Sequence, residues 1–296
     1  MVFMDRKGTG RLASAIERSR RRRWVVDQAA LAAFDGLLPM TVITGASTGI
    51  GLALAHRFAA AGHDLLLIAR SGDVLDEVAE GITLQYRVRA VPLALDITAA
   101  NATERIDAAL AAAKAYADVA VNNAAVGLSG DFATHTPENL DQLIALNVSA
   151  LTRITRHLLP GMLVRGRGGI LNIASLAAYT PGPYQAAYYA SKAYVLSLTE
   201  ALAHEVAGQG VLVSVVAPGA VATGFHARMG ATSALYTKLL PMPSAASVAD
   251  QTYRRFRLGQ RVIIPGLFNP LAMVGARVMP HRILVALVGL ILKPHR

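Results

Sequence analysis

A tyrosine and a lysine one helical turn apart are the residues of this chain best suited to moving protons. They are Tyr188 and Lys192, in the run Tyr-Tyr-Ala-Ser-Lys. On a helix, side chains four positions apart share a face, so we expect the phenol and the ammonium group to lie together. A free tyrosine has a pKa of about 10, and a nearby cation favours the phenolate. Upstream, Ser175 ends an apolar run, where its hydroxyl is placed to bind a carbonyl oxygen.

A glycine-rich turn near the start of the chain is the second chemical feature. The β-branched run 41–44 breaks into Gly45, Gly49 and Gly51, and a helical pattern follows. Glycines let a pyrophosphate approach the backbone, and the first amide groups of a helix stabilise its charge. The spacing is one residue longer than the common dinucleotide fingerprint, and no Lys-Ser/Thr pair follows as a triphosphate-binding loop requires. The turn therefore predicts a dinucleotide site and disfavours a nucleoside triphosphatase.

Alternating strand-like and helical segments must position these residues. The 296 residues, 53% of them hydrophobic, suffice for one large core. The alternation predicts an α/β fold with a doubly wound, mostly parallel sheet between two layers of helices. We expect strands, with a seventh at 261–265, within the following residues: 41–44, 65–69, 90–95, 119–121, 170–174 and 211–216.

Further motifs occur in a fixed order, and together they resemble the short-chain dehydrogenase/reductase family over about residues 40–225. Ser175 precedes Tyr188 by thirteen residues, which is the usual interval of that family. The resemblance implies a Rossmann fold over residues 39–270. The motifs are Thr44–Gly51, Asp96-Ile97, Asn122–Ala125, Asn147, Ser175, Tyr188 with Lys192, and Pro218–Thr223.

The resemblance also implies roles for four residues. Tyr188 is the general acid in reduction and the base in oxidation, while Ser175 hydrogen-bonds the reacting oxygen. Lys192 binds the nicotinamide ribose and lowers the pKa of Tyr188. Asn147 is expected to hold a water in a proton relay that leads to Lys192. The activity implied is interconversion of a carbonyl compound and a secondary alcohol by hydride transfer with a nicotinamide cofactor.

Cofactor contacts follow from the same resemblance. It implies that Asp96 and Ile97 lie near the adenine, 123–125 beside the adenosine ribose, and 218–223 around the carboxamide and pyrophosphate. Asn123 is equally suited to pinning a strand to a helix, and for Asn122 that structural role is favoured. The full set, besides Tyr188 and Lys192, is Gly45, Ser47, Thr48, Gly49, Ile50, Gly51, Arg70, Asp96, Ile97, Asn123, Ala124, Ala125, Pro218, Gly219, Val221 and Thr223.

The choice between the two nicotinamide cofactors depends on the end of the second strand. An acidic residue there would bind the ribose 2′-hydroxyl of NAD, whereas a cation suits the 2′-phosphate of NADP. This chain has Arg70, a planar fork of donors, followed by the hydroxyl of Ser71. NADP(H) is therefore favoured over NAD(H), although an ordinary solvated arginine is the alternative.

The substrate is expected to be hydrophobic. A lid at about 224–247 shows an apolar tendency, although its side chains are also suited to packing on the core. The apolar residues of this lid are Phe225, Met229, Leu235, Tyr236, Leu239, Leu240 and Met242.

Positive charge is confined to the two ends of the chain. Of the net charge of +10, residues 1–36 carry +4 and residues 251–296 carry +8, so 10 − 4 − 8 leaves −2 for the body. Specific nucleic-acid binding is therefore disfavoured. We expect residues 1–38 to form a solvated or disordered basic extension, and Met40 is a candidate start. No export signal is apparent and cysteine is absent, so a cytoplasmic location is predicted, with no metal site.

The segment 271–296 is expected to be an apolar and basic helical tail. Its apolar run 283–292 is ten residues long, too short to cross about 30 Å of hydrocarbon. Packing in a subunit contact is favoured over contact with an anionic membrane surface. The family resemblance implies a homodimer or homotetramer through the helices that carry Asn147 and Tyr188.

Two other classes of function stay open. The chain is also compatible with a nucleotide-sensing protein that keeps the fold without turnover, or with a membrane-surface protein that uses its basic ends. The complete set of Ser175, Tyr188, Lys192 and Asn147 argues against the first. The charge of the body argues against the second.

Overall fold

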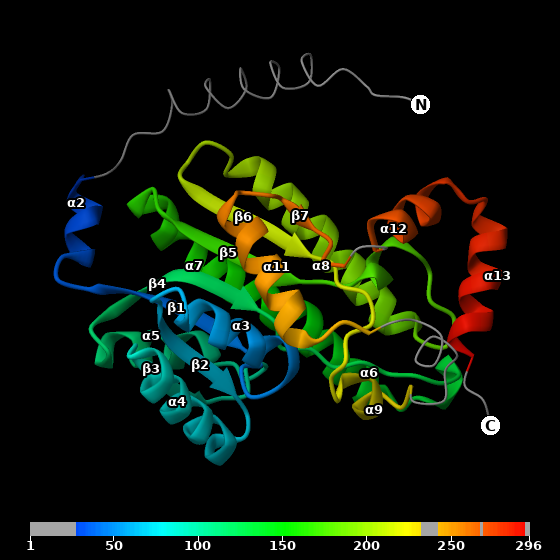
Figure 1. Cartoon of the computed structure of the whole chain (residues 1–296), viewed down its shortest axis with the longest axis horizontal. Helices are drawn as coiled ribbons and strands as arrows, with labels where there is room; N and C mark the ends of the chain where they lie inside the picture. The colour runs from blue at the N-terminus through cyan, green and yellow to red at the C-terminus, as the bar shows by residue number, and fades with distance from the viewer. Residues whose placement is uncertain (1–27, 232–241, 267–268, 294–296) are drawn as a thin grey trace.

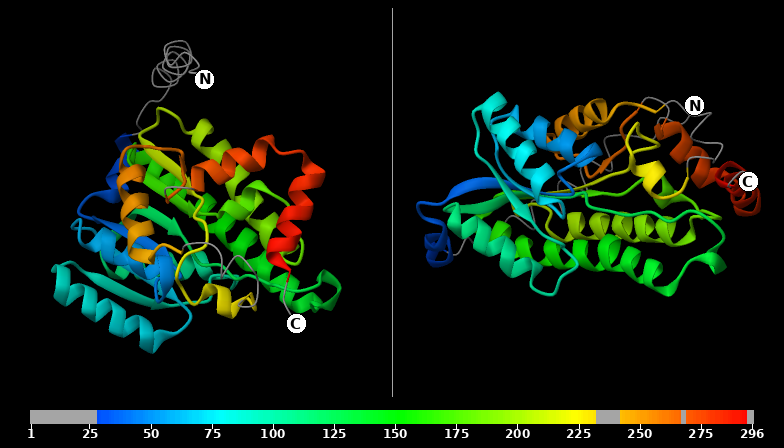
Figure 2. Two further views of the ribbon diagram at one scale, coloured as in Figure 1. Left: turned by 45° about the vertical axis from the view of Figure 1, so that its right-hand side comes forward. Right: turned by 90° about the horizontal axis from the view of Figure 1, so that it is seen from below.

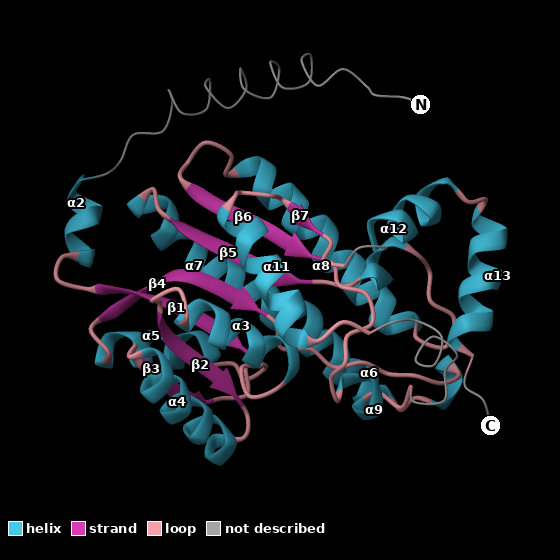
Figure 3. Cartoon of the chain, in the orientation of Figure 1, coloured by secondary structure: helices cyan, strands magenta, loops and turns pink. Residues whose placement is uncertain are grey.

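The computed structural model describes residues 28–231, 242–266 and 269–293, and its centre is one parallel sheet (Figures 1 and 3). Seven strands pair in the order β3-β2-β1-β4-β5-β6-β7, and every pairing is parallel. The predicted doubly wound α/β fold is therefore confirmed. The strands are β1 (Leu38–Thr44), β2 (Asp64–Ala69), β3 (Ala90–Ala94), β4 (Ala115–Asn122), β5 (Gly168–Ile173), β6 (Val211–Val216) and β7 (Val262–Ile263).

Helices connect and follow these strands. The longer ones are α3 (Gly49–Ala59), α4 (Gly72–Tyr86), α5 (Ala102–Ala112), α6 (Pro137–Ile144), α7 (Leu151–Arg165), α8 (Ala186–Glu205), α11 (Ala245–Arg257), α12 (Asn269–Val278) and α13 (His281–Leu292). The shorter ones are α2 (Gln28–Leu31), η1 (Ala32–Phe34), η2 (Phe132–Thr134), the π-helix η3 (Ala145–Ala150), η4 (Leu176–Tyr179) and α9 (Phe225–Arg228).

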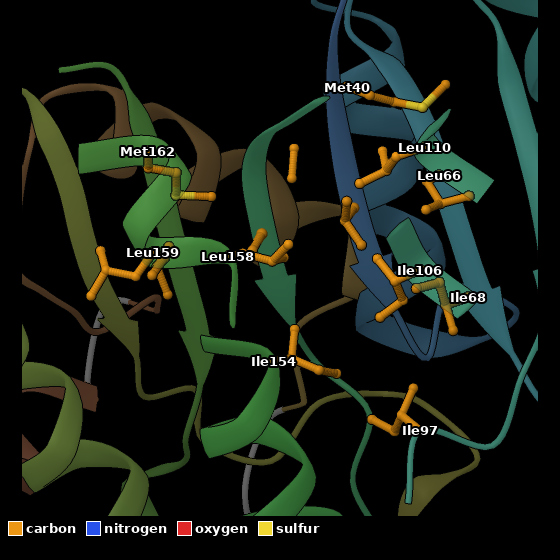
Figure 4. Packing of buried hydrophobic residues seen from close by; sticks show 14 of the residues in the cluster. Met40, Leu66, Ile68, Ile97, Ile106, Leu110, Ile154, Leu158, Leu159 and Met162 are labelled. Atoms are coloured by element: carbon orange, nitrogen blue, oxygen red, sulfur yellow. The ribbon is translucent and has the colours of Figure 1, made fainter. Parts of the chain in front are cut away.

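The sheet has a separate apolar layer on each face because successive side chains of a strand point to opposite sides. In β2, Leu66 and Ile68 face α5 and α7, where they lie beside Ile106 and Leu110 (Figure 4). Leu67 of the same strand faces the other layer, which contains α3, α4 and α11. The right-hand view of Figure 2 shows these helices on the two sides of the sheet. The helices thus hold the strands in place from both faces.

Two of the strands begin earlier than their apolar runs indicated. Leu38 and Pro39 pair with Ala115 and Tyr116, so β1 starts before its buried segment and β4 starts four residues before its predicted run. Leu38 and Pro39 are exposed at the amino-terminal end of the sheet, so burial does not mark them as part of a strand. The predicted seventh strand is present as the two-residue β7.

Buried amides and hydroxyls attach α7 and α8 to the sheet. The side-chain nitrogen of Asn122 donates to Thr155 on α7 at 3.0 Å and to Asn172 on β5 at 2.8 Å. Asn172 in turn donates to the hydroxyl of Thr199 on α8 at 2.9 Å. All four side chains are buried, where an unpaired polar group would be costly. This network, which includes the structural role favoured for Asn122, fixes where α8 lies.

The residues just before β1 differ from the expected solvated extension. Residues 28–37 include α2 and η1, and the ring of Phe34 packs edge-on against Tyr116 at a centroid distance of 5.7 Å. The guanidinium carbon of Arg165 lies 4.5 Å from the Phe34 ring centroid and 4.2 Å from that of Tyr116. Folded structure therefore begins ahead of Met40, while residues 1–27 lie outside the described part.

The C-terminal segment forms α12 and α13 beyond the carboxyl ends of the strands (Figure 1). Leu284 and Leu292 of α13 are buried within the same chain. In the part of the chain that the structure describes, no helix has both the length and the apolar character to cross a membrane.

Replacing Phe34 tests whether the segment before β1 contributes to stability. We expect Phe34→Ala to lower the free energy of unfolding by about 1–2 kcal/mol, because it removes a partly buried ring and its contact with Arg165. Urea denaturation measures this change. The control is Phe132→Ala, since that side chain is 59% exposed and its loss should change stability by less than about 0.5 kcal/mol. Equal losses in the two variants would contradict the assignment.

Candidate active site

The carboxyl ends of the strands surround one large cavity. Its volume is about 1230 Å³, which exceeds the usual range for a single small ligand. In a doubly wound sheet, ligands bind at this edge, outside the ends of the strands. The elements that line it are the glycine turn after β1, the ends of β2, β4, β5 and β6, helices α8 and α9, and the C-terminal helices α12 and α13.

The glycine turn forms a cradle that larger residues would fill. Gly45 and Gly49 have φ values of +66° and +60°, which favour glycine. A Cβ on Gly51, in the first turn of α3, would overlap the carbonyl oxygen of Gly45. The turn therefore brings backbone amides and the start of an eleven-residue helix to the cavity wall. This geometry fits the pyrophosphate of a dinucleotide.

Asn123 fixes this turn from the neighbouring strand. Its side-chain nitrogen donates to the carbonyl oxygens of Thr44 and Gly45 at 3.0 and 3.1 Å. The hydroxyl of Thr44 accepts the backbone N–H groups of Asn123 and Ala124. Asn123 thus has the structural role that was one of its two predicted alternatives, although it also lines the cavity.

Tyr188 and Lys192 lie on the wall of the same cavity, one turn apart on α8. The ammonium nitrogen of Lys192 is 5.7 Å from the centroid of the Tyr188 ring and donates to the carbonyl oxygen of Ile173 at 3.0 Å. Lys192 is 4% exposed, and burial lowers its pKa to about 8. At pH 7 the protonated form still predominates by about ten to one. A positive charge therefore lies beside the phenol and favours its ionised form.

Ser175 follows β5 and begins the short helix η4. Its hydroxyl accepts the N–H of Ala177 at 3.2 Å and lies 3.4 Å from the carbonyl oxygen of Pro218. It is a half-buried lining residue of the cavity that contains Tyr188 and Lys192. The three predicted side chains therefore line one cavity, and backbone contacts hold Ser175 there.

Asn147 has a different position from the other three predicted catalytic residues. It lies in the π-helix η3, a local widening that often occurs at functional sites. Its amide exchanges two hydrogen bonds with the backbone of Val126, at 2.9 and 2.8 Å, and donates to the Ser191 hydroxyl at 3.1 Å. Asn147 does not line the cavity, so its relay to Lys192 stays a prediction.

The far end of the cavity lies beside the ends of β2 and β3. Arg70 is exposed there. Ser71 is the N-cap residue of α4, and its hydroxyl makes no hydrogen bond to the backbone of that helix. Hydrogen bonds from Thr98, helped by the charge of Arg70, hold the pKa of Asp96 below its usual value. A cation, a hydroxyl and the start of a fifteen-residue helix thus meet at one place.

Nearly all the predicted site residues line this one cavity. The exceptions are Asn147 and Gly51, and Gly51 packs against the carbonyl oxygen of Gly45 in the glycine turn. Of the predicted lid, Phe225, Met229 and Met242 line the cavity. The remaining predicted lid residues lie outside the described part of the chain, namely Leu235, Tyr236, Leu239 and Leu240.

Some lining residues were not predicted from the sequence. Gln185 is 4% exposed, and among the described residues its side-chain nitrogen has no hydrogen-bond partner. It is the N-cap residue of α8, three positions before Tyr188, and that nearness in sequence was the available signal. Met273 of α12 and Val288 of α13 also line the cavity, and no local pattern indicated that the C-terminal helices reach the site. Among the described residues, no group of three or more His, Asp or Glu side chains is placed to hold a metal ion.

Comparison with known proteins identifies the family. The protein-family model described as "short chain dehydrogenase" matches residues 39–234, which is more than half of the chain. The chain therefore belongs to the short-chain dehydrogenase family.

The relatives carry the names of oxidoreductases. The chain is 36% identical to the very-long-chain 3-oxoacyl-CoA reductase of Bos taurus over 62% of this chain and 59% of that protein. It is 36% identical to the sulfoacetaldehyde reductase of Chromohalobacter salexigens, over 71% of this chain and 85% of that one. A solved short-chain dehydrogenase from Sphingobium yanoikuyae in complex with NADPH is 34% identical, with a TM-score of 0.72 and coverage of 81% and 93%. The matches span 59% to 66% of the vertebrate 3-oxoacyl-CoA reductases.

The glycine cradle can be tested by adding one methyl group. We expect Gly51→Ala to weaken NADPH binding at least about tenfold, because the new Cβ forces the turn and α3 apart at a cost of about 1.4 kcal/mol or more. Isothermal titration calorimetry measures the affinity, and circular dichroism checks folding. Gly81→Ala is the matched control, since Gly81 lies inside α4 with no atom within 4 Å of the new Cβ. Unchanged binding by Gly51→Ala would rule out the cradle.

Proposed function

We propose that this protein is an NADP(H)-dependent oxidoreductase that interconverts a hydrophobic carbonyl compound and a secondary alcohol. The observation that carries the proposal is that Ser175, Tyr188, Lys192 and the glycine cradle all line one cavity, with the Lys192 ammonium 5.7 Å from the centroid of the Tyr188 ring. The names of the relatives, which include reductases and dehydrogenases, support the same reaction class.

The side chains divide the work of the reaction between them. The bound cofactor would supply or accept the hydride. In reduction, Ser175 donates a hydrogen bond to the carbonyl oxygen, and Tyr188 gives that oxygen its hydroxyl proton, so that the product is an alcohol. The charge of Lys192 stabilises the phenolate left on Tyr188. In oxidation the phenolate takes the proton back.

NADP(H) is the proposed cofactor because of the charge at the end of β2. Arg70 offers a fork of donors to a 2′-phosphate, and the N-terminus of α4 adds its own partial positive charge. Solved relatives contain either cofactor form, since one is described in complex with NADPH and another in complex with NADH. Arg70 therefore carries this part of the proposal.

A hydrophobic substrate is proposed because of the lining around Tyr188. Phe225 lies tilted against the Tyr188 ring at a centroid distance of 5.6 Å, and Met229 is buried close by. Val288 and Ile291 of α13 extend the apolar wall. The amide of Gln185 adds one polar donor, which suits a substrate with a hydrogen-bond acceptor besides the reacting carbonyl.

The proton donor is tested by Tyr188→Phe. We expect turnover to fall about 10²- to 10⁴-fold while NADPH affinity is kept, because only the acidic proton is removed. NADPH oxidation is followed against ketones and aldehydes of graded size. Tyr194→Phe on the same helix is the control, because its hydroxyl lies 3.0 Å from Thr152 and outside the cavity. Undiminished turnover would end the assignment, and cofactor binding without turnover of any substrate by the wild type would favour a nucleotide sensor.

Cofactor choice is tested by Arg70→Asp. We expect the ratio of kcat/KM for NADPH over NADH to fall by about tenfold to a hundredfold, because a charged hydrogen bond is worth 1.5–3 kcal/mol. Arg156→Asp is the control, since Arg156 is an exposed residue of α7 that does not line the cavity, and its replacement makes the same change of charge. If the two variants shift the ratio equally, the effect is long-range and Arg70 does not bind the phosphate.

A further inference from the structure

Helix α13 exposes three large apolar side chains on one face. Ile283, Leu287 and Leu290 are 58%, 42% and 62% exposed. Their spacing of four and then three residues places them along one side of the helix. Contiguous exposed apolar surface of this kind marks a binding surface more often than a free one.

Helix α12 repeats the pattern immediately before it. Leu271, Val274 and Val278 are 71%, 49% and 76% exposed and also share one helical face. Met279 and Pro280 alone separate the two helices, which project together from one edge of the molecule (Figures 1 and 2). We call these six side chains the C-terminal apolar surface.

The opposite sides of the same helices face the cavity. Val288, Ile291 and Leu292 of α13 and Met273 of α12 are lining residues. One helix, about 10 Å thick with its side chains, therefore separates the apolar surface from the proposed substrate site. The C-terminal apolar surface and the proposed substrate site therefore lie on the same two helices, α12 and α13.

A basic margin accompanies this surface. Arg277, Arg282 and Lys293 are exposed on or beside the two helices. No aspartate or glutamate occurs between residues 251 and 296, where eight lysines and arginines stand. Apolar side chains bordered by cations match the boundary between the acyl chains and the anionic headgroups of a bilayer.

We propose that the C-terminal apolar surface docks on an anionic lipid bilayer, with α12 and α13 lying in the plane of its surface. The apolar side chains enter the acyl boundary, and Arg282 and Lys293 reach the headgroups with their long stems, while Arg277 lies over the ring of Tyr179 at 5.4 Å from its centroid. The apolar wall of the cavity then lies next to the lipid, which suits a substrate that partitions from the membrane. The docking itself does not rest on the proposed function.

A second copy of the chain fits this surface less well. A two-fold contact brings the same patch of both copies together. Arg282 and Lys293 of both copies would then lie in one interface, and this segment offers no acidic residue to pair with them. Like charges at an interface are unfavourable, whereas an anionic bilayer neutralises all of them.

Vesicle co-sedimentation with the full chain tests the docking. The vesicles contain either phosphatidylcholine alone or phosphatidylcholine with phosphatidylglycerol. We expect binding to the anionic vesicles, and we expect Leu287→Ser with Leu290→Ser to reduce the partition coefficient at least about tenfold. The matched control is Leu84→Ser with Leu258→Ser, which removes two leucines that are 74% and 84% exposed elsewhere. Both variants keep the arginine-rich run 18–23, so its contribution cancels.

Charge is tested separately with Arg282→Gln and Lys293→Gln. We expect this double variant to bind anionic vesicles at least about tenfold more weakly than the wild type, because each cation near the surface contributes about 1 kcal/mol to the attraction. Thermal unfolding establishes that each variant is folded. Equal binding by the leucine variant and its control, or no binding by the wild type, would overturn the proposal. So would sedimentation velocity showing a dimer that only the Leu287→Ser and Leu290→Ser changes dissociate.

Discussion

The burial of the Lys192 ammonium group is the constraint around which the site is built. Taking a charge out of water costs several kcal/mol, and here one carbonyl oxygen, that of Ile173, meets it at 3.0 Å. The lowered pKa of about 8 records that cost. Such a group keeps its place only if α8 cannot move, and the buried bond between Asn172 and Thr199 holds that helix to β5. Burial of Lys192 therefore lowers the stability of the fold, and the buried hydrogen-bonded network that includes Asn172 and Thr199 offsets this cost.

The loop after β4 connects the two halves of the cavity. Asn122, the last residue of β4, joins the polar network under α7, while in the loop Asn123 holds the glycine turn and Val126 is held by Asn147. The cradle and the tyrosine wall are therefore positioned from one strand end. This arrangement explains why amides recur here, since each satisfies backbone or buried groups in two directions.

Local patterns predicted the sheet, the cradle and the pairing of Tyr188 with Lys192, because each depends on residues close in sequence. What they missed depends on contacts between distant segments. The amide of Asn147 turns toward Val126, twenty-one residues away in the chain, and Phe34 packs on Tyr116. For the same reason, the sequence did not indicate that α13 forms part of the cavity wall. An apolar run predicts burial but does not say against which partner.

The composition of α13 follows from having two apolar environments instead of one. An ordinary surface helix is apolar on one face and polar on the other. In α13 the inner residues Val288 and Ile291 line the cavity, while Leu287 and Leu290 are exposed outside. Water on that outer face would favour polar side chains, as it does on α11, which exposes Ser247, Arg254 and Arg257. On a lipid surface the outer face of α13 does not need polar side chains. The cations at its margin are then the groups that contact water and the lipid headgroups.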